Sequence, residues 1–90
     1  MIELDLVAAG KDYLVVFEAK RRINPDRIRE FVDRISVIRD YFPEHAASRV
    51  VPVIASVNIE SSVITYLNRQ KVYGVAMGDE TMDLVNLGGF

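Results

Sequence analysis

The segment YLVVFEAK, residues Tyr13–Lys20, constrains the fold more than any other part of this 90-residue chain. Half of its residues are β-branched or aromatic, which is typical of a strand in a packed sheet. The run ends in Glu18 and Lys20, which lie two positions apart and therefore project from one face of a strand. A buried strand that ends in a carboxylate and an ammonium group predicts either a functional site or a salt-bridged strand end.

The rest of the chain predicts one α/β domain over residues 1–90, with a mixed β-sheet flanked by helices. Runs with the two-residue period of strands alternate with runs at helical spacing, in the order ββαβα(ββ). Single helices between strands imply right-handed crossovers, and both faces of the first hairpin are largely apolar, so we expect a sheet covered on both sides. The expected strands are residues 2–8, 13–20, 49–57, 72–77 and 82–87, and the expected helix caps are Asn24 and either Ser61 or Ser62.

The segment between the second and third strands predicts an amphipathic helix. Asn24 and Pro25 form a strong helix start, because Asn caps free backbone N–H groups and Pro suits the first helical position. Apolar residues recur at helical spacing as far as Pro43, which we expect to end the helix. On the solvent face we expect ion pairs between residues three or four apart, namely Asp26–Arg29 and Glu30–Arg34.

The turn between the first two strands decides whether Asp5 lies on the same face of the sheet as Glu18. Gly10 and Lys11 predict a two-residue loop of type II′, with glycine at the first central position. This loop pairs odd-numbered with even-numbered residues, so that Glu3 lies opposite Glu18 and Asp5 lies one diagonal step away. A slip of one residue would turn Asp5 to the other face.

Asp5, Glu18 and Lys20 together predict the chemistry of a metal-dependent hydrolase. Two carboxylates that converge at a strand end repel each other unless a cation lies between them, and hard oxygen ligands select Mg²⁺ or Mn²⁺. Such an ion delivers a water nucleophile and polarises a phosphoryl oxygen. A lysine beside that water can orient it, help to take its proton or stabilise developing charge. The expected reaction is hydrolysis of a phosphodiester.

The segments IELDLVA and YLVVFEAK resemble the core of the PD-(D/E)XK nuclease superfamily, which has the restriction-endonuclease-like fold. In that family an Asp lies in one strand and a Glu-x-Lys in the next, and the resemblance extends over most of this chain, with Leu4 in place of the family's Pro. The resemblance implies that Asp5, Glu18 and the Ala19 carbonyl bind the metal. It also implies that Asp5, Glu18 and Lys20 are catalytic.

One departure from the superfamily concerns the start of the chain. The family usually has a helix with a further acid ahead of the Asp strand, whereas Met1 begins almost on that strand. We therefore expect a core without the usual N-terminal helix, whose missing elements belong to a longer protein, come from a partner chain or have been lost. Glu3 is either a substitute for the missing acid or a solvent-facing residue.

The charge distribution restricts the expected contact with nucleic acid to one region. A net charge of −2 excludes a wholesale electrostatic grip, because phosphate binding requires clustered Lys and Arg. Arg21 and Arg22 directly follow the expected site, so we expect them to contact backbone phosphates, of DNA rather than RNA. The alternative is a catalytically inactive module of the same fold, which serves docking or forms a homodimer through an exposed sheet edge.

The sequence offers no membrane-spanning or disulfide-bonded segment. The longest apolar runs are strand-sized and fall short of the roughly 20 residues that a membrane span needs. Acidic residues at the start are unlike a secretory signal, and the absence of cysteine excludes disulfides and thiolate metal sites. We therefore expect a cytoplasmic protein.

Overall fold

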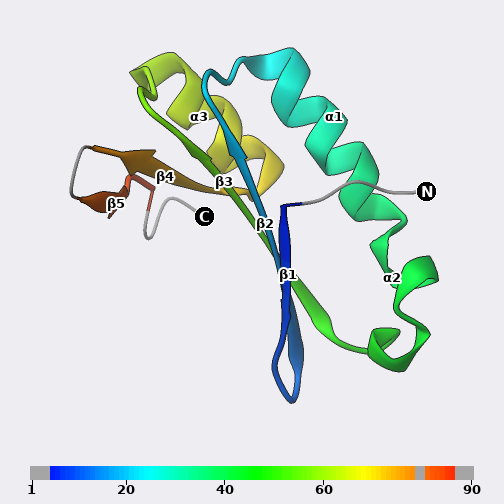
Figure 1. The fold of residues 1–90 in the computed structure, drawn as a ribbon. Helices are drawn as coiled ribbons and strands as arrows, with labels where there is room; N and C mark the ends of the chain where they lie inside the picture. Colours follow the sequence, from blue (N-terminus) through cyan, green and yellow to red (C-terminus); the bar gives the residue numbers. More distant parts are fainter. Residues whose placement is uncertain (1–4, 79–80, 87–90) are drawn as a thin grey trace.

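Five strands form one mixed sheet in the computed structural model, which describes residues 5–78 and 81–86 (Figure 1). Their order in the sheet is their order in the sequence, so the expected α/β class with a mixed sheet is confirmed. The three central strands are parallel, and the first and last strands pair antiparallel at the two edges. The strands are β1 (Leu6–Ala9), β2 (Tyr13–Lys20), β3 (Arg49–Ser56), β4 (Tyr73–Met77) and β5 (Met82–Leu84).

Helices cover one face of this sheet. The described helices are α1 (Pro25–Ser36), α2 (Ile38–Tyr41), α3 (Ser61–Gln70) and a short 3₁₀-helix, η1 (Pro43–His45). The crossovers through α1 and α3 both step in the same direction along the sheet, and right-handed crossovers of that kind place both helices on one side (Figure 1). No described helix is long and apolar enough to cross a membrane.

The hydrophobic core lies between the helices and one face of the sheet. It joins Leu14 and Val16 of β2 and Ile54 of β3 to helix residues that include Ile28 and Phe31. These strand residues alternate with residues that point to the other face, none of which belongs to this cluster and of which only Ala55 is fully buried. The expectation of a sheet covered on both sides is therefore wrong for the described residues, although the second face is apolar as well.

The structure confirms the expected start of α1 and differs from the sequence prediction at the end of α1 and at the start of α3. The Asn24 side chain accepts a hydrogen bond from Arg27 N at 2.9 Å, so the expected cap of α1 is confirmed. The expected single helix to Pro43 is interrupted at Val37, where φ of −111° and ψ of 6° end α1 before α2 begins. The cap of α3 is Glu60, without a side-chain hydrogen bond, so the expected cap at Ser61 or Ser62 is wrong.

The turn of the β1–β2 hairpin lies one residue later than the sequence predicts. Gly10 N donates a hydrogen bond to Tyr13 O at 2.8 Å, so Lys11 and Asp12 form the loop. Among the described non-glycine residues only Lys71 has positive φ, so Lys11 lacks the conformation that a type I′ or II′ turn needs at its first central position. The expected type II′ turn at Gly10 and Lys11 is therefore wrong.

The shifted turn changes the hairpin register by two residues and keeps its parity. Leu6 pairs with Phe17, so odd-numbered residues still lie opposite even-numbered ones. The paired residues of β1 end at Leu6, and extension of this register by one step would set Asp5 opposite Glu18, where the sequence had placed Glu3. Glu3 itself lies outside the described residues.

A buried asparagine ties the C-terminal part of the described chain to β4. Gly74 N donates to Asn86 Oδ1 at 2.8 Å, and Asn86 Nδ2 donates to Val72 O at 2.8 Å and to Asn68 Oδ1 at 3.1 Å. Asn86 is buried, so these bonds replace water for both the side chain and the backbone groups.

Replacing Asn86 by alanine is expected to lower the free energy of unfolding by about 2–3 kcal/mol, because buried backbone groups at Gly74 and Val72 lose their partners. Urea denaturation measures the change. Asn58→Ala, at an exposed asparagine, is the matched control and should stay within about 0.5 kcal/mol of the wild type. Equal losses in the two variants would contradict this role of Asn86.

Candidate functional site

Glu18 is a buried carboxylate near the C-terminal end of β2. Only 4% of the residue is exposed, and its side chain points to the helix-covered face, as do those of Leu14 and Val16. A carboxylate in this position must be compensated by positive charge and hydrogen bonds, because burial of an isolated ion is costly.

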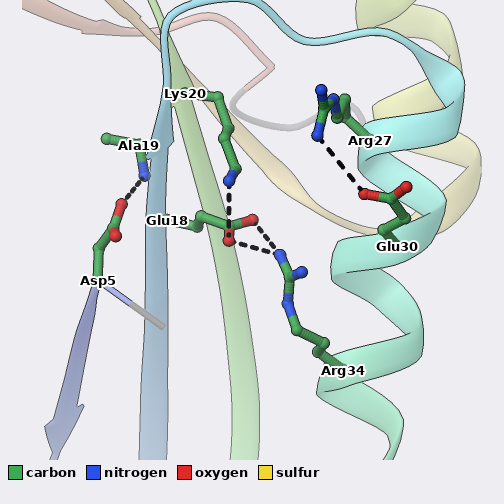
Figure 2. Close-up of polar contacts among 7 residues, drawn as sticks. All are labelled: Asp5, Glu18, Ala19, Lys20, Arg27, Glu30 and Arg34. Atoms are coloured by element: carbon green, nitrogen blue, oxygen red, sulfur yellow. Dashed lines mark hydrogen bonds and ion pairs between the residues drawn. The ribbon is translucent and has the colours of Figure 1, made fainter. Parts of the chain in front are cut away.

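Two cations compensate Glu18 (Figure 2). Arg34, in the last turn of α1, places Nη2 at 2.5 Å from Oε1 and 2.6 Å from Oε2 of the carboxylate. Lys20 Nζ lies 3.7 Å from Oε1 and comes from the same strand. The side chains of Glu18, Lys20 and Arg34 thus form one cluster between β2 and α1, which we call the Glu18 cluster.

Arg34 was expected to pair with Glu30 on the solvent face of the helix, and this expectation is wrong. Glu30 contacts Arg27 at 3.9 Å instead, while the expected Asp26–Arg29 pair is confirmed at 3.0 Å. The physical reason is burial, since Glu30 is exposed and hydrated whereas Glu18 depends on protein partners. Arg34 is therefore the residue of the site that the sequence reasoning missed.

A signal for Arg34 was present in the helix pattern. Arg34 follows Phe31 by three residues and precedes Ile35, so it borders the apolar stripe of α1 rather than the opposite face. A cation at that border is close to the sheet that the stripe covers. A buried acid on the adjacent strand then makes it the natural partner.

Asp5 lies beside β2 at the level of the same cluster. Ala19 N donates a hydrogen bond to Asp5 Oδ2 at 2.7 Å, so the carboxylate takes the place of a strand partner just before β1 begins. Figure 2 shows the Asp5 carboxylate directed at the Ala19 nitrogen and the Glu18 carboxylate directed at Lys20 and Arg34. The structure thus brings Asp5, Glu18, Ala19 and Lys20 to one end of β2.

The atoms at this end of β2 that could bind a metal ion are all oxygens. Within residues 5–78 and 81–86, no group of three or more His, Asp or Glu side chains is placed to hold a metal ion. Asp5 and Glu18 supply two carboxylates, and Mg²⁺ is commonly held by only one or two carboxylates because it keeps several waters. The donor set therefore fits a hard cation in type, although Arg34 contacts both Glu18 oxygens in this structure.

Arg21 and Arg22 lie in the exposed loop that follows β2. Both line a cleft of about 230 Å³ together with Val57 and Asn58. Arg22 also lines a larger cleft of about 480 Å³, whose other lining residues include the starts of α1 and α3. Both clefts lie at the carboxyl ends of the parallel strands β2 and β3, where α/β folds commonly bind ligands.

Comparison with known proteins identifies the family of the chain. No curated protein matches the chain, and no solved structure matches it. One family model, described as a domain of unknown function (DUF8196), matches residues 1–84. Because this match spans most of the chain, the protein belongs to the DUF8196 family.

Proposed function

We propose that this domain is a metal-dependent phosphodiesterase that acts on nucleic acid, on DNA rather than RNA. The observation that carries the proposal is the placement of three groups at one end of β2. These are the buried Glu18, Lys20 with Nζ at 3.7 Å from the Glu18 carboxylate, and Asp5, which accepts a hydrogen bond from the backbone of Ala19, next to Glu18. A carboxylate pair beside a lysine is the donor and proton-handling set that phosphodiester hydrolysis needs.

Asp5, Glu18 and the Ala19 carbonyl would hold Mg²⁺ or Mn²⁺. Within a strand, the N–H and the C=O of one residue point toward the same neighbouring strand. Because Ala19 N donates to Asp5, the Ala19 carbonyl is directed to the side on which Asp5 lies. When bound, the ion would supply a water nucleophile and polarise a phosphoryl oxygen.

Three basic side chains would contact the substrate. The Lys20 ammonium is partly exposed, so it can reach a substrate phosphate, orient the attacking water and stabilise developing negative charge. Arg21 and Arg22 would contact the backbone phosphates on either side, from the loop that lines both clefts.

We also propose that the five-stranded sheet and its helices form a restriction-endonuclease-like core. Support comes from the antiparallel β1–β2 hairpin, which has Asp5 before its first strand and Glu18 and Lys20 in its second. The crossover through α1 to the parallel strand β3 supports it as well. The resemblance of IELDLVA and YLVVFEAK to PD-(D/E)XK nucleases agrees with this arrangement.

Arg34 has a defined part in this proposal as the counter-ion of Glu18 before metal binds. Its Nε atom is buried and has no hydrogen-bond partner among the described residues. The guanidinium is thus incompletely satisfied in its position against Glu18, which lowers the cost of displacing it from the carboxylate.

A second candidate function is favoured by the same ion pair. Arg34 Nη2 lies within 2.6 Å of both Glu18 oxygens, as expected of a structural salt bridge. In this case the chain is a catalytically inactive module of the same architecture, which acts by docking or assembly. The two candidates differ in whether Glu18 binds metal, and the experiments below separate them.

A cleavage assay tests the proposed reaction. The wild-type chain with Mg²⁺ or Mn²⁺ is expected to cut single-stranded, duplex or branched DNA, and EDTA should abolish the cleavage, because the two carboxylates need a cation to act. Labelled RNA of the same sequence is the matched substrate and should be cut more slowly. Absence of cleavage on every substrate with either ion would contradict the proposed reaction.

A further inference from the structure

The face of the sheet opposite the helices is largely apolar. The register aligns one row of side chains across it, from Leu6 through Phe17 and Val53 to Tyr73. The described residues place no helix over this face, since both crossovers run on the other side. We call this surface the open face.

The open face continues over β4 and β5 with the same character. A second row runs from Ala19 through Ala55 and Val75 to Leu84. Arg49, at the first position of β3, is the one charged strand residue that the described registers place on this face. The strand residues of the open face are therefore apolar apart from Arg49, which lies at one margin.

Among the open-face residues only Ala55 is fully buried, and several others are largely exposed. Leu6 and Met82 are 57% and 60% exposed, and Leu84 is 42% exposed. Monomeric proteins rarely leave contiguous apolar patches of more than a few hundred Å² in water. An apolar sheet face of this kind marks a docking surface.

The planar area of the open face comes close to the smallest area of a specific homodimer interface. The five strands contain 28 residues. At about 3.3 Å per residue and about 4.8 Å between strands, they cover roughly 450 Å² of planar area. Two such faces would bury roughly 900 Å² before side-chain relief is added, close to the ~1,000 Å² at which specific interfaces begin.

We propose that the chain forms a two-fold symmetric homodimer in which the open faces of two copies pack against each other. A second copy fits because a nearly uncharged surface is complementary to itself, and sheets pack face to face at about 10 Å in β-sandwiches. Arg49 lies at the margin, where it can remain hydrated. The Glu18 cluster lies on the other face, so the dimer does not cover it and is independent of the proposed reaction.

Sedimentation velocity with two matched pairs of variants tests the dimer. Leu84→Lys on the open face is compared with Val37→Lys between α1 and α2, because both residues are 42% exposed. Tyr13→Lys on the open face is compared with Tyr41→Lys in α2, at 50% and 49% exposure. Circular dichroism establishes that each variant is folded.

We expect a wild-type dimer whose dissociation constant rises roughly 100-fold in each open-face variant, because a lysine would be buried without a partner. The two control variants should stay within about twofold of the wild type. A wild-type chain that is monomeric at roughly 100 µM would assign the face to a different protein or segment and overturn the proposal. The proposal would also be overturned if the dissociation constants of both open-face variants stayed as close to the wild-type value as those of the controls.

Discussion

Glu18→Gln is expected to lower kcat/KM for DNA cleavage by roughly 1,000-fold with little change in fold. The amide has the shape of the carboxylate and can still accept hydrogen bonds from Arg34, whose Nη2 lies at 2.5 Å. It lacks the negative charge that would hold a divalent cation beside Asp5. Initial rates on labelled DNA with Mg²⁺ measure the effect.

The control for Glu18→Gln is the same change at Glu30, an exposed carboxylate that pairs with Arg27 at 3.9 Å. Glu30→Gln should change the rate less than about twofold, because exposed pairs contribute little. If the two variants lose activity equally, or if Glu18→Gln cleaves like the wild type, Glu18 has no part in the reaction.

Arg34→Met is expected to lower the free energy of unfolding by about 2–3 kcal/mol. Among the described residues, the substitution leaves the buried Glu18 with Lys20 as its one cation, at 3.7 Å. Loss of one partner from a fully buried ion pair costs about 3–5 kcal/mol, and we discount this because Arg34 is 29% exposed and Lys20 remains. Urea denaturation of Arg34→Met and of Arg27→Met, an exposed arginine, measures the difference.

Two further measurements on Arg34→Met separate a metal site from a structural salt bridge. Saturating Mn²⁺ should stabilise Arg34→Met more than the wild type, because the ion no longer competes with Arg34 for the Glu18 oxygens. In the absence of metal, Arg34→Met combined with Glu18→Leu should recover most of the lost stability. If Mn²⁺ does not raise the free energy of unfolding of Arg34→Met, the result would contradict a metal site at Glu18.

The strand that carries the site was predictable because its pattern is local. Tyr13–Lys20 is a strand over the residues that the apolar run indicates, and alternation alone places Glu18 on the face of Leu14 and Val16. The turn was not predictable in detail, because the backbone conformation of Lys11 does not follow from residue preferences. Moving a two-residue turn by one position changes the register by two residues. Odd-numbered residues therefore still pair with even-numbered ones, which keeps Asp5 at the level of Glu18.

The partner of Glu18 and the coverage of the sheet depend on tertiary structure and were not predictable. Arg34 has an acid four residues before it, so the local rule favoured the solvent-facing pair, whereas the buried carboxylate has the larger need for compensation. An apolar second face indicates that something covers it, and sequence alone does not distinguish a helix of the same chain from a second copy.

Anomalous diffraction from crystals grown with saturating Mn²⁺ tests the central claim most directly. We expect one peak at about 2.0–2.3 Å from carboxylate oxygens of Asp5 and Glu18 and from the Ala19 carbonyl oxygen. Arg34 should then have moved away from at least one of the Glu18 oxygens that it contacts in the present structure. A map without a peak beside Asp5, with both Glu18 oxygens still paired to Arg34, would contradict the metal site.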